Sequence, residues 1–320
     1  MTHFLSIIIP THQRCDLLRA CLQAVRRHAP AGCEVIVVDD ASPGGSATAV
    51  AAEFAGVRIV RRDRRGGFAQ AANAGILAST GDIVELLNDD TEVQPSWADH
   101  ALQWFDDPTI SAVAPLVLVW PDGKTIDSAG DRYHLAGIAG KRGRGETPDV
   151  KFLTPCRVFG VSAAAGFYRR SALNRVGLFP EAFGSYFEDV DLAFRLNRAG
   201  YATMFEPCSR VLHHVSASYG IVGRKLIERQ SCNEERVFWR NLPLSALRKA
   251  LPMHAAILAG KVLRRWDEGT LVPWLFGRLR AWRDWRAIRA HRNELARLTA
   301  NSNVAEWCVE DTIAELQRWT

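Results

Sequence analysis

The first 110 residues alternate apolar runs rich in β-branched residues with segments of helical periodicity, and this alternation limits the possible folds most strongly. Strands are predicted at "FLSIIIP", "CEVIVVDD", "VRIVRR" and "DIVELLNDD", and helices at "CDLLRACLQAVRRH", "SATAVAAEFA", "FAQAANAGILAST" and "PSWADHALQWF". Continuous apolar runs are typical of strands buried on both faces, and strands that alternate with helices favour a parallel sheet with crossover helices. We therefore predict an α/β fold with a mostly parallel sheet flanked by helices.

Polar side chains follow three of the predicted strands. They are Thr11, His12 and Arg14 after the first strand, Asp39 and Asp40 after the second, and Asp89 and Asp90 after the fourth. Ligands of such sheets bind beyond the carboxyl ends of the strands, which makes these residues a candidate site; the alternative is that they cap helices and form turns. Adjacent carboxylates repel each other and resist burial, so Asp89 and Asp90 need a cation or hydrogen-bond donors opposite them.

The composition narrows the class of protein. A net charge of +5 favours an anionic ligand or surface over nucleic acid. The seven cysteines form no CxxC pair, which indicates reduced thiols in a cytoplasmic protein rather than a disulfide framework or a zinc site. No secretory leader is recognisable, and no apolar run approaches the roughly 18 residues of a transmembrane helix.

The chain beyond residue 225 has the pattern of helices rich in arginine and tryptophan. In "LFGRLRAWRDWRAIRAHRNEL" apolar residues recur at helical spacing with arginines between them. Such a helix is typical of one that lies on an anionic membrane surface, which would place the protein at the inner face of the plasma membrane. The alternative is that the apolar stripe packs on the rest of the protein while the arginines face solvent.

Four ordered motifs resemble family 2 glycosyltransferases of the GT-A fold, over roughly residues 4 to 220. The motifs are "SIIIPTHQR", "VIVVDDAS", "GGFAQAANAGILASTGDIVELLNDDTEV" and "GSYFEDVDLAFRLNRAGY". The resemblance implies a nucleotide-sugar donor-binding half at 1–110 and an acceptor-binding, catalytic half of the same domain at 111–224. Residues 225–320 would then be a helical Arg/Trp-rich extension.

The segment "DGKTIDSAGDRYHLAGIAGKRGRGE" resembles the acceptor-side segment of the bacterial rhamnosyltransferase-like branch of this family. Its glycine content predicts a mobile loop able to close over the donor. No residue of this segment is predicted to take part in the chemistry.

The resemblance implies a divalent cation, Mn²⁺ or Mg²⁺, on the donor diphosphate, since hard cations take carboxylate ligands and stabilise a departing phosphate. Asp90 would be a metal ligand, Asp89 would face the ribose, and His213 would be a further metal ligand. The alternative for His213 is an ordinary core histidine. Asn88 stands where the family often has aspartate, and Glu92 would share the side of Asp90 if the stretch stays extended.

The nucleotide pocket is implied by the same resemblance. Asp40 would accept the N3–H of a uracil or thymine ring, and Pro10, Thr11 and Arg14 would line the same pocket; a solvated position is the alternative for Arg14. In the glycine-rich stretch "RRGGFAQAANAG" the resemblance implies donor-binding roles for Gly67 and Asn73 only, because Arg65 stands where the family commonly has asparagine.

The stretch "FEDVDL" supplies the predicted catalytic carboxylates Glu188, Asp189 and Asp191. An attacking acceptor hydroxyl must lose its proton, and Asp189 resembles the general base of the family. Carboxylates at a helix start also serve as plain caps, which is the alternative.

The sequence thus predicts an inverting, metal-dependent glycosyltransferase of cell-envelope polysaccharide synthesis. The donor would be a dTDP- or UDP-sugar, with dTDP-rhamnose a candidate, and the acceptor a glycan or lipid-linked saccharide. One rival is a sugar-1-phosphate nucleotidyltransferase, although "PTHQR" lacks the glycine-rich loop this needs. The other rival is a catalytically silent nucleotide-sugar-binding module, which the intact carboxylates argue against.

Overall fold

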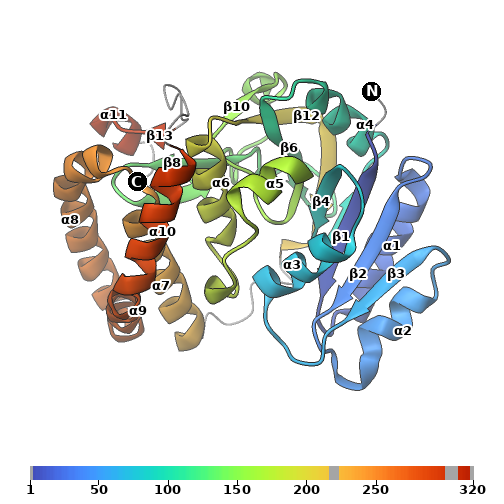
Figure 1. The fold of residues 1–320 in the computed structure, drawn as a ribbon, viewed down its shortest axis with the longest axis horizontal. Coiled ribbons are helices and arrows are strands. Elements are labelled where there is room, and N and C mark those ends of the chain that lie inside the picture. The colour runs from blue at the N-terminus through green and yellow to red at the C-terminus, as the bar shows by residue number, and fades with distance from the viewer. Residues whose placement is uncertain (1–2, 216–222, 300–308, 318–320) are drawn as a thin grey trace.

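A computed structural model of the chain describes residues 3–215, 223–299 and 309–317 (Figure 1). Its main sheet has the strand order β10-β12-β6-β11-β4-β1-β2-β3, with β5 beside β12 and β7 beside β6. The strands of the first half are β1 (Leu5–Thr11), β2 (Glu34–Asp39), β3 (Val57–Arg61), β4 (Ile83–Leu87) and β5 (Thr91–Val93). Strand β1 runs parallel to β2 and β4, and β2 runs parallel to β3. The predicted α/β fold is therefore confirmed, and the carboxyl ends of β1, β2 and β4 meet at one edge.

The helices of the first half cover both faces of this sheet, as predicted. They are α1 (Cys15–His28), α2 (Ser46–Ala52), α3 (Phe68–Ala78) and α4 (Trp97–Leu102). Helix α3 shares a hydrophobic core with Ile8, whereas α1, α2 and α4 share the opposite core with Ile7 and Ile9. Successive side chains of a strand point to opposite faces, so the apolar run in β1 supplies both cores.

The predicted fourth strand ends earlier than expected. Strand β4 stops at Leu87, and Asp89 and Asp90 form a turn before β5. The Asn88 N–H still bonds to the Ala164 carbonyl in register with β11, and the turn closes just beyond it, where Thr91 Oγ1 donates to the Asn88 carbonyl at 2.7 Å. The stretch therefore does not stay extended, which was the condition for Glu92 to share the side of Asp90. The Glu92 carboxylate lies 2.8 Å from His214 Nε2.

The second half continues the same sheet with mixed strand directions, except that its hairpin at 131–141 belongs to a separate three-stranded sheet. Its elements are β6 (Ile110–Val119), β7 (Ile126–Ser128), β8 (Asp131–His134), β9 (Ile138–Lys141), β10 (Cys156–Val158), β11 (Ala165–Arg169), α5 (Arg170–Val176), α6 (Glu188–Arg198) and β12 (Ala202–His213). Strand β11 is antiparallel to both β4 and β6, and β12 is parallel to β6. This pairing brings the end of β12 next to the turn that follows β4.

The glycine-rich segment predicted as a mobile loop is instead largely ordered structure. It forms β7, which pairs with β6, and the β8–β9 hairpin, and it buries Ile126, Asp127, Asp131 and Tyr133. The glycines serve its turns: Gly137, between β8 and β9, has φ of 87°, a conformation that side chains with a Cβ rarely adopt.

The C-terminal part is helical, as predicted, and packs beside α6 (Figure 1). It comprises α7 (Arg224–Asn241), α8 (Leu244–Asp267), α9 (Leu271–Arg283), α10 (Trp285–Leu298), the short strand β13 (Val309–Glu310) and α11 (Ile313–Gln317). Helix α8 forms the edge of the molecule farthest from β1–β4. Among the helices of the described residues, none has the length and apolar character needed to cross a membrane.

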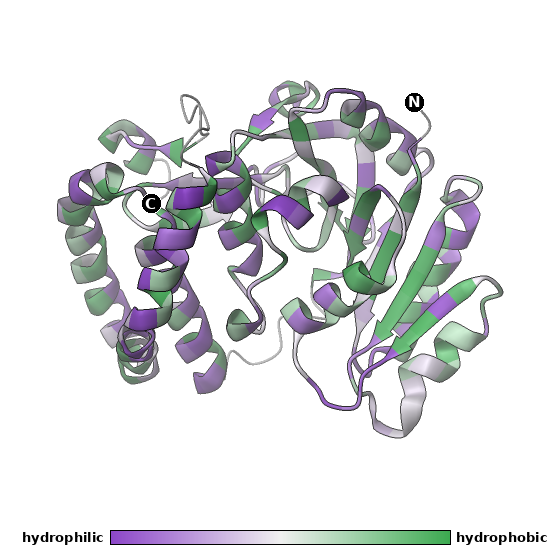
Figure 2. Cartoon of the chain, in the orientation of Figure 1, coloured by the Kyte–Doolittle hydropathy of each residue, from purple (hydrophilic) through white to green (hydrophobic). Residues whose placement is uncertain are grey.

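Charged side chains help to hold these helices together. Arg278 of α9 donates to Glu234 and Glu235 of α7, and Glu235 also accepts a bond from Trp239 Nε1. Figure 2 shows how the two parts differ in hydropathy. The central strands are mostly apolar, whereas the C-terminal helices alternate hydrophilic and hydrophobic residues along their length.

Candidate active site

Polar residues from the ends of β1 and β4 meet, as the sequence predicts. Thr11 Oγ1 donates to Asp89 Oδ2 at 2.7 Å, and Arg14 donates to Asp90 Oδ2 at 2.6 Å. The same Arg14 nitrogen lies 3.6 Å from Asp89 Oδ1. Arg14 thus offsets part of the charge of the buried carboxylate pair. Pro10 precedes Thr11 in β1. Burial raises the pKa of Asp89 to about 6, although Thr11 and Arg14 oppose the shift.

His213, at the end of β12, lies beside the same pair. Its Nε2 is 3.2 Å from Asp90 Oδ1, and its Nδ1 is 2.9 Å from Asp127 Oδ2. The pairing of β5 with β12, which sets His213 opposite Thr91, brings the imidazole here. Burial disfavours the charged ring, but Asp127 and Asp90 together raise the pKa of His213. The two predicted metal ligands are therefore neighbours.

Asp90 and His213 have the donor types and the spacing for a divalent cation. Adjacent ligands of an octahedral ion with bonds of 2.0–2.1 Å lie about 3 Å apart, close to the 3.2 Å found here. His213 Nε2 is buried and has the Asp90 carboxylate within hydrogen-bond reach. No group of three or more His, Cys, Asp or Glu side chains in the described parts of the chain could hold a metal ion. A cation at Asp90 and His213 would therefore need further ligands from a bound molecule or water.

Asp40 and Gly67 shape the loop before α3. The Asp40 carboxylate accepts the N–H groups of Gly66 and Gly67 and a bond from Arg62. Gly67 has φ of 83°, and a Cβ on it would lie 3.1 Å from the Gly184 carbonyl oxygen. Gly67 thus allows the start of α3 to approach the segment that leads into α6.

Asn73 lies in α3 and is buried. Its side-chain amide donates to the Phe179 carbonyl at 2.9 Å and accepts from the Phe179 N–H at 3.0 Å. Both polar ends of this side chain therefore hold α3 against the segment before α6. A contact between Asn73 and the nucleotide-sugar donor stays a prediction.

Asp189 lies half-buried in the first turn of α6. Its carboxylate accepts the N–H of Ala163 at 3.1 Å and that of Val190 at 2.8 Å. Burial raises its pKa, against the effect of these donors. The neighbouring Glu188 is buried, and burial together with the Asp189 charge raises its pKa well above the ordinary value.

The backbone before these carboxylates is strained. Tyr186 and Phe187 both have positive φ, 73° and 69°, although neither is a glycine. Such conformations are uncommon for bulky residues and concentrate at functional sites. They aim the start of α6, and with it Asp189, at a fixed angle.

Asp191 has a structural environment, which corrects its predicted catalytic role. It is fully buried, accepts from Arg195 at 3.0 Å and from Asn241 at 2.7 Å, and lies 3.1 Å from Arg240. Burial opposes its charge, but Arg240 and Arg195 lower its pKa to about 2. With its oxygens engaged by these groups, Asp191 joins α6 to α7 and presents no carboxylate to a substrate.

The structure adds three residues that the sequence analysis left out, all from the glycine-rich segment. Asp127 bonds to His213 and to Lys141 Nζ, the latter at 2.7 Å. Asp131 lies opposite Lys141 in the β8–β9 hairpin, and burial together with the Asp189 charge raises the pKa of Asp131. The resemblance of this segment to the rhamnosyltransferase-like branch was the available signal. It pointed to the segment but not to these three residues.

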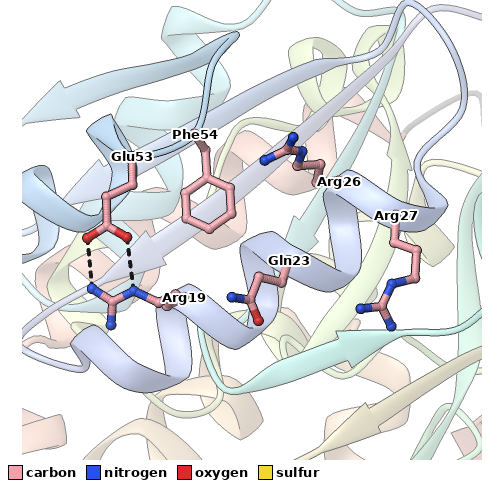
Figure 3. Close-up of a pocket in the computed structure, with 6 residues that line it drawn as sticks. All are labelled: Arg19, Gln23, Arg26, Arg27, Glu53 and Phe54. Atoms are coloured by element: carbon pink, nitrogen blue, oxygen red, sulfur yellow. Dashed lines mark hydrogen bonds and ion pairs between the residues drawn. The ribbon is translucent and has the colours of Figure 1, made fainter.

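A separate hollow of about 470 Å³ lies on α1 and α2 (Figure 3). Its lining residues are Arg19, Gln23, Arg26, Arg27, Glu53 and Phe54. Arg19 forms a two-pronged ion pair with Glu53 there, at 3.0 and 2.8 Å. None of these residues belongs to the cluster around Asp90, so the hollow is not the candidate active site.

Residues 6–177 match the family described as Glycosyl transferase family 2, more than half of the chain, and the protein belongs to this family. The pre-mycofactocin glycosyltransferase of Mycobacterium tuberculosis is 33% identical over 213 residues, which cover 65% of this chain and 42% of that protein. The N-acetylglucosaminyl-diphospho-decaprenol L-rhamnosyltransferase of the same organism is 28% identical over 247 residues, covering 69% and 79% of the two chains. The chain thus spans about two fifths of the length of the first of these relatives.

The fold has a counterpart among solved structures. The mannosyltransferase PcManGT of Pyrobaculum calidifontis, in complex with GDP-Man and Mn²⁺, superposes with a TM-score of 0.55 and 22% identity. The superposition covers 94% of this chain and 86% of that one. This likeness identifies the shared fold, a GT-A glycosyltransferase fold, as the sequence motifs predict.

Proposed function

We propose that this protein transfers a sugar, with inversion, from a nucleoside diphosphate sugar to a hydroxyl group of a saccharide or lipid-linked acceptor. The observation that carries the proposal is the meeting of Asp89, Asp90, Arg14 and His213 at the ends of β1, β4 and β12. A buried acidic pair that faces both a guanidinium and an imidazole suits a ligand with a diphosphate and a bound cation.

At the donor end, Asp90 and His213 would hold Mn²⁺ or Mg²⁺. Such a cation, when bound, neutralises charge on a departing diphosphate. Arg14 adds positive charge to the same place, and Asp89, oriented by Thr11, would accept a ribose hydroxyl. Asp40 keeps its proposed place at a uracil or thymine ring, and Gly67 lets the backbone approach the donor.

At the acceptor end, Asp189 is the proposed general base. Its carboxylate would take the proton of the acceptor hydroxyl, whose oxygen attacks the anomeric carbon while the bond from that carbon to the diphosphate breaks. The burial that raises the pKa of Asp189 makes it a stronger base than an exposed aspartate. Burial and the Asp189 charge raise the pKa of both Glu188 and Asp131 beside it.

The proposed substrates follow the relatives' names. One relative is named as an L-rhamnosyltransferase acting on a decaprenol diphosphate carrier. This supports dTDP-rhamnose or a UDP-sugar as donor, and a lipid-linked saccharide of cell-envelope polysaccharide synthesis as acceptor.

The outer face of α9 supports binding of the protein to a membrane surface. Val272, Leu275, Phe276, Leu279 and Trp282 recur at the spacing of one helix face, and all are exposed. The opposite face, with Trp274 and Ala281, is buried against the protein. Packing of an apolar stripe on the rest of the protein therefore explains the buried face of α9 but not its exposed apolar face. Exposed arginines, Arg280, Arg283, Arg286 and Arg289, follow along α9 and α10. We propose that this face lies on an anionic lipid surface at the inner side of the plasma membrane.

The test of the catalytic proposal is Asp189→Asn, compared with Asp16→Asn on the exposed start of α1. Donor binding should be retained in both variants, measured as the shift of melting temperature by UDP or dTDP with Mn²⁺. Transfer should fall by roughly 10²–10⁴-fold in Asp189→Asn alone, because general-base catalysis contributes about that much. Unchanged turnover of Asp189→Asn would refute the role, and wild-type protein that binds donors yet transfers none would favour the silent module.

A further inference from the structure

Asp127, which is buried, and Lys141, which is partly exposed, form a charged pair directly behind His213. Asp127 lies in β7 and is 2% exposed, and its Oδ2 receives both His213 Nδ1, at 2.9 Å, and Lys141 Nζ, at 2.7 Å. The two partners come from β12 and β9, 86 and 14 residues along the chain, so three strands converge on one carboxylate oxygen. Burial opposes its charge, yet His213 and Lys141 hold the pKa of Asp127 below its ordinary range.

Asp127 lies on one side of the His213 ring and Asp90 on the other. Nδ1 is 2.9 Å from Asp127 Oδ2, and Nε2 is 3.2 Å from Asp90 Oδ1. A cation at Asp90 would take the lone pair of Nε2, and Nδ1 would then carry the N–H that donates to Asp127. A carboxylate that accepts from the far nitrogen of a metal-binding histidine fixes the direction of the ring.

The pair is not needed to hold the β12 main chain. The backbone at His213 is already fixed, because the Trp120 N–H donates to the His213 carbonyl and the His214 N–H donates to the Asp90 carbonyl. Stacking of Trp120 on His214, with ring centroids 4.2 Å apart, adds to this. The contact with Asp127 therefore acts on the imidazole ring rather than on the strand.

We propose that Asp127, fixed in place by Lys141, is a positioning residue that holds the His213 ring with Nε2 toward the cation site at Asp90. This inference rests on the proposed function, because it takes His213 to be a metal ligand. It assigns the glycine-rich segment a purpose at the donor end of the site, where the sequence analysis expected only a loop over the donor.

The test is the affinity for Mn²⁺ alone and with UDP, followed by the electron paramagnetic resonance signal of free Mn²⁺. Asp127→Asn should bind Mn²⁺ about 10–100-fold more weakly, the usual cost of losing such a partner, while UDP binding without metal stays unchanged. Lys141→Gln should have a smaller effect in the same direction. Glu92→Gln, which alters the carboxylate beside His214 instead, is the matched control and should bind as the wild type does.

The variants separate the two levels of the proposal. If His213→Ala weakens Mn²⁺ binding and Asp127→Asn does not, the positioning role is wrong while the proposed function stands. If neither variant changes Mn²⁺ binding, His213 is not a metal ligand, and both the positioning role and that part of the proposed function are wrong. A measurement on the wild type, nitrogen-15 resonance of the His213 ring with Mg²⁺ and UDP bound, needs no variant. It should find the proton on Nδ1, and a proton on Nε2 would overturn the proposal.

Discussion

At the residue scale, Glu85 is a carboxylate buried in the central sheet. It occupies the middle of β4, is fully buried, and accepts one hydrogen bond, from Trp97 Nε1 at 2.8 Å. Burial raises its pKa to about 8, against the effect of Trp97. In the folded protein Glu85 is therefore neutral at pH 7, whereas in the unfolded chain it ionises near its ordinary value of 4.5.

The raised pKa of Glu85 predicts a stability that falls with rising pH. Between pH 4.5 and about 8 the folded state binds a proton that the unfolded state has lost, so folding weakens as pH rises through this window. Glu85→Gln removes this cost and keeps an acceptor for Trp97, and it should add up to about 3 kcal/mol at pH 7. Urea denaturation should give equal stabilities for the two proteins near pH 4.5 and a growing advantage of the variant above it. A constant difference across this range would contradict the assignment.

At the element scale, α6 carries two carboxylates with opposite tasks only two residues apart. Asp189 faces the candidate site, whereas Asp191 ties α6 to Arg240 and Asn241 of α7. Asp191→Ala should destabilise the fold by about 3–5 kcal/mol, because it leaves buried arginines without their partner.

The lowered pKa of Asp191 also predicts how its contribution to stability changes with pH. Its lowered pKa contributes stability that is fully present above the ordinary value of 3.8 and is lost as pH falls toward about 2. The melting temperatures of wild type and Asp191→Ala should therefore converge in acid. Asp189→Asn is the control, and it should melt close to the wild type. A normal melting temperature in Asp191→Ala would show that the ion pair does not hold α6 to α7.

Gly137, in the turn of the β8–β9 hairpin, and Gly145, in the turn after β9, are a matched pair of glycines. Gly137 and Gly145 have similar φ values, 87° and 82°, but a Cβ on Gly137 would lie 2.5 Å from His254 Nδ1, whereas nothing lies within 4 Å of one on Gly145. Gly145→Ala should cost about 1 kcal/mol for the backbone alone, and Gly137→Ala about 1–3 kcal/mol more for the overlap with His254. Thermal unfolding of the two variants measures the difference, and equal costs would mean that α8 can move away from the hairpin.

The same hairpin marks the limit of prediction from sequence. Strands β1 to β4 were predictable because long β-branched runs alternate with helices, and the order of the motifs placed Thr11, Asp89 and Asp90 at one edge. Strands β7 to β9 have three or four residues each, too few for a period to show. Asp127 is 86 residues from His213, and their contact depends on pairings of β6, β7 and β12 that no local pattern encodes. Asp191 was mistaken for a catalytic residue because its partners, Arg240 and Asn241, lie in a different helix.

At the scale of the whole molecule, the C-terminal helices combine a buried charged interior with an apolar exterior. Arg278 and Glu235 bind each other inside the bundle, which fixes α9 on α7. The outward side of α9 then exposes Phe276 by 58% and Leu279 by 60%. An apolar face bordered by arginines suits an anionic bilayer, where apolar contact and electrostatic attraction add together.

The vesicle test follows from this arrangement. The wild type should float with vesicles that contain anionic phospholipid, bind vesicles of phosphatidylcholine alone more weakly, and dissociate as salt screens the arginines. Replacing both Phe276 and Leu279 by serine should abolish flotation without lowering the melting temperature, because neither side chain is buried. Leu77→Ser is the control, since Leu77 is 76% exposed on α3 and lies outside the C-terminal helices. If the double variant floats like the wild type, this face of α9 does not contact lipid. If it loses flotation but still transfers sugar to a soluble acceptor, membrane contact serves the delivery of the acceptor and not the chemistry at Asp189.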